Sequence, residues 1–128
     1  MMSLKQKSVM DCHDVALHFN PRLKENIIVR NTYQNGQWGD EERNGDILLK
    51  PGSNFTLNII CETRGYKIYI DDKEFTFYSH RILPQSITHL RIKGLMTLCS
   101  ILYKSTSVCN NNISILILEL VLCNLIVI

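Results

Sequence analysis

Short segments in which apolar and polar residues alternate fill the first 94 residues, and this pattern constrains the fold more than any other feature. Residues 14–23 alternate in this way, as do residues 55–61, and such alternation is typical of a strand with one buried face. Turn-forming pairs such as Asn35-Gly36 separate the segments. Further strands are expected at residues 27–31, 66–70, 74–78 and 87–93. No apolar stripe with a helical period interrupts them, so the sequence predicts an all-β fold of antiparallel strands.

Charge and cysteine content exclude several classes of protein. The 14 Lys and Arg residues against 12 Asp and Glu give a net charge of +2, which is too small for a nucleic-acid-binding surface. The five cysteines are irregularly spaced and form no CxxC pair, so neither a zinc knuckle nor a redox motif is indicated. Residues 1–5 lack the apolar core of a signal peptide. We therefore expect reduced thiols and a cytoplasmic protein, or one that is secreted without a signal peptide.

The last quarter of the chain differs in composition from the rest. Residues 113–128 contain 13 apolar residues of 16, which is fewer than the roughly 20 that a membrane-spanning helix needs. The same composition suits a buried strand that replaces a missing edge strand, or a segment without a structural role. These interpretations stay open. We divide the chain into an N-terminal segment (1–11), a partial domain (12–103) and an apolar tail (104–128).

One predicted strand carries three polar side chains in a row. His18, Asn20 and Arg22 stand at positions i, i+2 and i+4, so they share the face opposite the apolar one. Because the apolar face is already filled, burial in the core does not explain the three together. A row of donors and acceptors indicates a binding platform, although an ordinary solvated face remains the alternative.

A second group of candidate residues follows a turn. Trp38 is the one tryptophan of the chain and is surrounded by polar and charged residues, which predicts a partly exposed indole with an apolar face and a polar edge. Glu41 and Arg43 are separated by one residue. We expect them to share a strand face and to fix each other by charge-assisted hydrogen bonds.

Together these residues resemble the galectin signature. The elements that carry the resemblance, in the order typical of the family, are His18-Phe19-Asn20-Pro21-Arg22, Val29-Arg30-Asn31 and Trp38-Gly39-Asp40-Glu41-Glu42-Arg43. Looser similarity continues through Pro51-Gly52 and Tyr78-Ser79-His80-Arg81 to about residue 94. The short step from Arg22 to Asn31 resembles the C-terminal domains of tandem-repeat galectins. The resemblance implies a galectin-type antiparallel β-sandwich, which we expect to be incomplete because few residues precede His18.

The resemblance also implies roles for seven residues. His18, Asn20 and Arg22 would contact the axial 4-hydroxyl of galactose, and Asn31 and Glu41 would contact the 6-hydroxyl. Trp38 would stack on the sugar ring, while Arg43 would reach the neighbouring sugar and hold Glu41. The expected function is non-catalytic binding of β-galactosides on glycoproteins or glycolipids, without a cofactor.

Two other functions, hydrolysis of a glycosidic bond and metal binding, fit the sequence less well. Glu41 and Glu42 are sequential, so on a strand they point to opposite faces and do not form the carboxylate pair of a glycosidase. The possible metal ligands Cys12, His13, His18, His80 and His89 have no recognised ligand spacing. Two alternatives remain: a fragment that acts through protein interactions or regulation without binding sugar, and a form that associates with membranes through its apolar tail.

Overall fold

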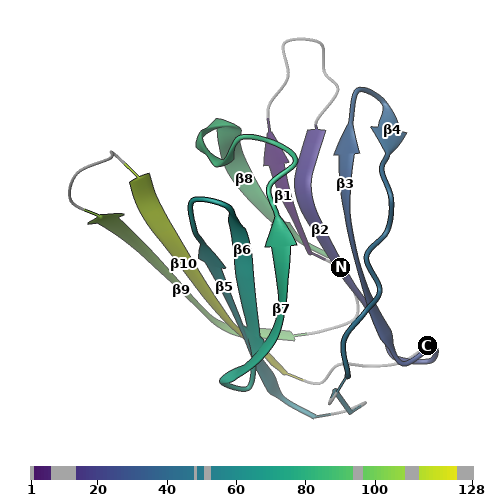
Figure 1. Ribbon diagram of the computed structural model, residues 1–128. Coiled ribbons are helices and arrows are strands. Elements are labelled where there is room, and N and C mark those ends of the chain that lie inside the picture. Colours follow the sequence, from purple (N-terminus) through teal and green to yellow (C-terminus); the bar gives the residue numbers. More distant parts are fainter. Residues whose placement is uncertain are drawn as a thin grey trace. The chain divides into compact units, whose positions relative to one another are not determined.

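The computed structural model describes residues 2–6, 14–47, 49–50, 53–93, 97–108 and 113–123. Its strands form two five-stranded sheets, and it divides into two compact units (Figure 1). One unit comprises residues 1–48 and 80–94, and the other comprises residues 49–79 and 95–128. A short 3₁₀ turn at Pro84–Ser86 is the one helical element among the described residues. The predicted all-β class is therefore confirmed.

The sheet of the first unit has the strand order β4-β3-β2-β1-β8. Its strands are β1 (Met2–Gln6), β2 (Asp14–Arg22), β3 (Ile27–Gln34), β4 (Gln37–Trp38) and β8 (Ile87–Ile92). All neighbouring pairs are antiparallel. Because β2 lies between β3 and β1, its outward side chains have neighbours from two strands.

Two tight turns connect the strands that carry the candidate residues. Between β2 and β3, the amides of Glu25 and Asn26 donate to the carbonyls of Arg22 and Leu23. Between β3 and β4, Asn35 and Gly36 both have positive φ, at 54° and 77°. Two consecutive residues in this conformation make the turn that matches strand twist in a two-residue hairpin. The predicted turn at Asn35-Gly36 is confirmed.

The sheet of the second unit has the order β7-β6-β5-β10-β9. Its strands are β5 (Phe55–Cys61), β6 (Gly65–Ile70), β7 (Lys73–Ser79), β9 (Thr97–Val108) and β10 (Ile113–Cys123). Every second residue of β5 is buried, and these residues are Phe55, Leu57, Ile59 and Cys61. The alternation predicted for residues 55–61 is thus confirmed residue by residue.

The apolar tail contributes a strand to this second sheet. β10 pairs with β5 on one side and with β9 on the other, both antiparallel. Of the interpretations left open by composition, the strand is the one that the structure contains. No helix in the described part of the chain is both long and apolar enough to cross a membrane. Residues 124–128 lie outside the described part.

The first residues of the chain are also a strand, which the sequence did not predict. β1 pairs with β2 in a register that places Ser3 beside His18, and with β8 in a register that places Ser3 beside Arg91. Five residues are too few for a reliable alternating pattern. The strand forms because it pairs with β2 and β8. β1 thereby lies next to the strand with the polar row.

Candidate binding site

The polar row predicted on β2 is present on one face of that strand. His18, Asn20 and Arg22 are half-buried, whereas Leu17 and Phe19 on the other face are each 1% exposed. In the pairing of β2 with β3, His18 lies opposite Asn31, and directly opposed residues of a pair point to the same side of a sheet. The sheet therefore brings the signature residues of β2 and β3 to one face.

His18 is oriented by two neighbours. Its Nδ1 lies 2.9 Å from the hydroxyl of Ser3 in β1, and its ring centroid lies 4.9 Å from that of Trp38. Because Ser3 occupies Nδ1, Nε2 is the ring nitrogen that can face a ligand. Burial, together with the charge of Arg22, lowers the pKa of His18. Both effects favour the neutral imidazole over the charged one.

Trp38 ends β4 and is 51% exposed, one of the largest exposed apolar side chains among the described residues. The edge contact with Tyr33 has a centroid distance of 5.1 Å and an interplanar angle of 63°. Tyr33 and His18 thus hold the indole while a large part of its surface stays open. The prediction of a partly exposed tryptophan is confirmed.

Glu41 lies between two arginines. Its Oε2 is 2.6 Å from Nη2 of Arg43 and accepts a hydrogen bond from Nε of the same residue at 2.7 Å. Its Oε1 is 3.7 Å from Nη2 of Arg22, which also faces Glu25 at 3.8 Å. Exposed ion pairs of this kind add little to the free energy of unfolding. Their effect here is to fix the direction of the charged groups beside the row on β2.

The backbone around Glu41 differs from the expected strand. Glu41 and Arg43 lie outside the strands and flank Glu42, which forms an isolated bridge with Arg30. The amide of Arg30 donates to the carbonyl of Glu42 at 2.9 Å, and the amide of Glu42 donates to the carbonyl of Arg30 at 2.8 Å. The predicted Glu41–Arg43 contact is present, but this single bridge replaces the expected strand.

Asn31 is 4% exposed and is held by the protein on both sides of its amide. Its Oδ1 accepts from the amide of Thr32 at 2.8 Å and from Nη1 of Arg81 at 3.1 Å. Its Nδ2 donates to the carbonyl of Gly39 at 2.8 Å. An amide nitrogen carries two hydrogens, and the described hydrogen bond to Gly39 uses one of them.

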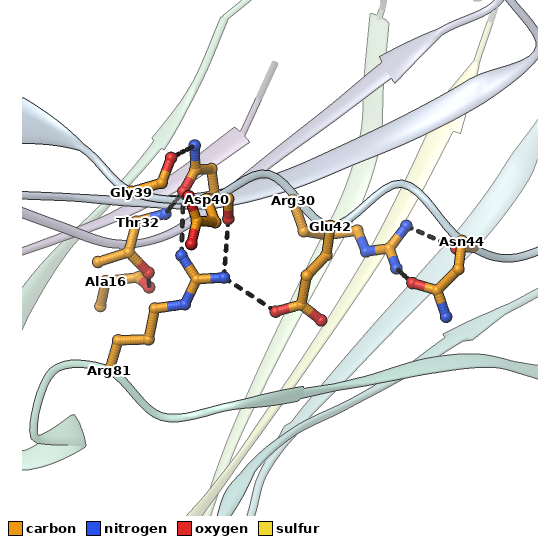
Figure 2. Close-up of polar contacts among 9 residues, drawn as sticks. Ala16, Arg30, Thr32, Gly39, Asp40, Glu42, Asn44 and Arg81 are labelled. Carbon is orange, nitrogen blue, oxygen red and sulfur yellow. Dashed lines mark hydrogen bonds and ion pairs between the residues drawn. The ribbon is translucent and has the colours of Figure 1, made fainter.

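Arg81 is, like Ser3, a residue of this site to which sequence analysis gave no role. It follows β7 in the chain but contacts the segment after β4, where Nη2 donates to the carbonyl of Asp40 at 2.9 Å and to Oε2 of Glu42 at 3.0 Å (Figure 2). Glu41 and Glu42 thus turn to different arginines, as expected for sequential residues. Nothing local in the sequence indicates contacts that span about 40 residues.

These groups suit a small polar ligand with one apolar face. On β2, His18 lies beside the open indole of Trp38 and Arg22 lies beside the charged pair Glu41–Arg43, all within one unit. Among the residues that the structure describes, no three His, Cys, Asp or Glu side chains are grouped to hold a metal ion. Cys12 and His13, two of the possible ligands, lie outside that part of the chain.

Comparison with known proteins agrees with the signature. The sequence matches the family described as galactoside-binding lectin over residues 1–103. The chain belongs to this family. It is 39% identical over 88 residues to a 32 kDa beta-galactoside-binding lectin of Haemonchus contortus, and 45% identical over 87 residues to galectin-4 of Sus scrofa. It is also 38% identical over 88 residues to galectin-7 of Mus musculus.

These matches cover a larger share of this chain than of the relatives. They cover 69%, 66% and 69% of this chain, in the order given, but 31%, 27% and 65% of the relatives. The chain thus spans less than a third of the first two relatives. The galectin match ends at residue 103, so β10 lies outside it.

The lowered pKa of His18 gives this galectin-family site an expected pH dependence. The unfolded chain binds a proton near pH 6.5, whereas folded His18 binds it only at lower pH. The contribution of His18 to the free energy of unfolding is therefore complete above pH 6.5. It is lost as the pH falls through the lower pKa of the folded state. NMR titration should place the midpoint of the His18 ring signals below 6.5, and the His18→Gln variant should lack this part of the acid destabilisation. A midpoint at or above 6.5 would contradict the described burial.

Proposed function

We propose that the chain is a lectin that binds β-galactosides of the lactose or N-acetyllactosamine type and does not act on them as an enzyme. The observation that carries the proposal is the set of His18, Asn20 and Arg22 on one face of β2 beside the open indole of Trp38. Glycans on glycoproteins or glycolipids would be its partners.

The chemistry of galactose fits this arrangement. Galactose has an axial 4-hydroxyl, and one side of its ring presents a patch of C–H groups. In the proposed complex the C–H patch lies on Trp38, while the 4-hydroxyl meets the side chains of the β2 row. The remaining N–H of Asn31 and the carboxylate of Glu41 take the 6-hydroxyl, and Arg43 reaches the adjoining sugar.

The carboxylates favour binding over hydrolysis. A glycosidase needs two carboxyl groups on opposite sides of the bond that it cleaves. Glu41 faces Arg22 and Arg43, whereas Glu42 turns to Arg81. The two carboxylates thus contact different arginines. A carboxylate held in this way can still accept hydrogen bonds from sugar hydroxyls.

Retention on immobilised lactose tests the proposal. Lactose and cellobiose differ in the configuration of the 4-hydroxyl on the non-reducing sugar. We expect free lactose to elute the protein and cellobiose at the same concentration to leave it bound. Calorimetry with both sugars gives the affinity ratio. A folded protein that passes through the lactose column without retention would refute the proposal and favour a role in protein interactions.

A further inference from the structure

Arg81 joins the two groups that are expected to meet the 6-hydroxyl of galactose. Its Nη1 donates to Oδ1 of Asn31 at 3.1 Å. Its Nη2 donates to the carbonyl of Asp40 at 2.9 Å and to the carboxylate of Glu42 at 3.0 Å (Figure 2). Asp40 and Glu42 are the residues immediately before and after Glu41. One guanidinium therefore contacts the amide of Asn31 and the two residues next to Glu41 in the sequence.

The segment that carries Glu41 has few other restraints. β4 ends at Trp38. Beyond it, the described backbone hydrogen bonds are one from the Gly39 amide to the Thr32 carbonyl and two between Arg30 and Glu42. A side chain that binds Asp40 and Glu42 at once therefore limits how the segment can shift. Glu42 is turned toward Arg81, and the preceding side chain, Glu41, points to Arg22 and Arg43.

Gly39 leaves the space that Arg81 needs. A Cβ atom placed on Gly39 would lie 2.9 Å from Nη1 of Arg81 and 3.4 Å from Oδ1 of Asn31. The first distance is too short for a real contact, so any larger residue at this position would displace the end of the Arg81 side chain. The glycine, the amide of Asn31 and the guanidinium thus form one tightly packed contact.

We propose that Arg81 is a positioning residue that sets selectivity for the 6-hydroxyl of galactose. This inference rests on the proposed function. Arg81 acts through Asn31 and Glu41. It fixes the Asn31 amide so that its remaining N–H has one direction, and it holds the two residues that flank Glu41, through the backbone carbonyl of Asp40 and the side-chain carboxylate of Glu42. Lysine cannot replace it, because an ammonium group lacks the planar fork that reaches three acceptors in two directions.

The test compares two ligands that differ only in the 6-hydroxyl. Calorimetry measures lactose and 6′-deoxylactose, which lacks this hydroxyl on galactose, with the wild-type protein and with Arg81→Lys. We expect the variant to lose about tenfold in lactose affinity, the size of one hydrogen bond to a charged or well-oriented partner. Its affinity for 6′-deoxylactose should change less than twofold, and its preference for lactose over cellobiose should persist.

Two further variants make the test specific. Gly39→Ala displaces the guanidinium without removing it, so it should show the same selective loss and remains informative if Arg81→Lys fails to fold. Arg64→Lys, at an exposed arginine between β5 and β6, is the matched control and should change neither affinity.

The outcomes separate the two proposals. Equal weakening of lactose and 6′-deoxylactose would show that Arg81 acts only on the stability of the site and would overturn this inference while leaving the lectin function intact. Unchanged lactose affinity in folded Arg81→Lys would also overturn it. Absence of lactose binding by the wild-type protein would refute the proposed function itself, and the inference with it.

Discussion

Replacement of Trp38 with alanine is expected to abolish lactose binding while the far-UV circular dichroism spectrum stays unchanged. The side chain is 51% exposed, so its removal takes little apolar surface from the core. Its loss should cost the ligand more than about 2 kcal/mol, or roughly thirtyfold in affinity, which is typical of a central aromatic contact. Retention on immobilised lactose and calorimetry measure the effect.

A second exposed aromatic residue supplies the control for this variant. Phe77 in β7 is 38% exposed and belongs to the other unit. Phe77→Ala should leave lactose affinity within the error of the wild type. If folded Trp38→Ala binds lactose as well as the wild-type protein, the site assignment is wrong. If the variant unfolds, Trp38 contributes to the core and the assignment loses its main support.

The Arg22→Ala variant is expected to lose on the order of 2–4 kcal/mol of galactoside affinity, because it removes charged donors and a partner of Glu41. Arg22 is half-buried between Glu25 and Glu41, so its charge also orients the carboxylate next to it. Discrimination between lactose and cellobiose should fall as well, since an equatorial 4-hydroxyl does not meet the row on β2. Calorimetry with both sugars measures the two losses together.

The Arg22→Lys variant separates charge from geometry. Lysine keeps the positive charge but offers a single ammonium group. We therefore expect an intermediate loss of lactose affinity, and the preference for lactose over cellobiose should be largely lost. An Arg22→Ala variant that prefers lactose over cellobiose by the wild-type ratio would contradict the role of Arg22 at the 4-hydroxyl.

Sequence alone predicted the strands whose alternation is long enough to identify. β5 has the predicted bounds, and β2 ends one residue before the predicted end. β1 was missed because Met2–Gln6 is too short for a pattern, and its pairing partners are distant in the chain. For the tail, composition left several interpretations open because a continuous apolar run carries no period. Pairing with β5 decided it.

The same distinction applies to the site. His18, Asn20 and Arg22 are predictable because a strand places alternate residues on one face whatever the rest of the fold does. Their binding roles stay predictions. The contacts of Ser3 with His18 and of Arg81 with Asn31 span 15 and 50 residues, and no local rule supplies them. Sequence analysis therefore found the groups expected to touch a sugar and the local Glu41–Arg43 contact, but missed Ser3 and Arg81, which orient these groups from distant parts of the sequence.

All seven predicted contact residues, together with Arg81, belong to one of the two compact units. Ligand binding stabilises only the states in which the site is formed, by about 2.7 kcal/mol at a concentration of 100 times Kd. A galactoside would therefore slow hydrogen exchange in the sheet of β2 and β3 directly. Exchange in β5 and β6 would slow to the same degree only if both units open in a single cooperative step. The confinement of the site to one unit thus makes the sugar a probe of folding cooperativity in this chain.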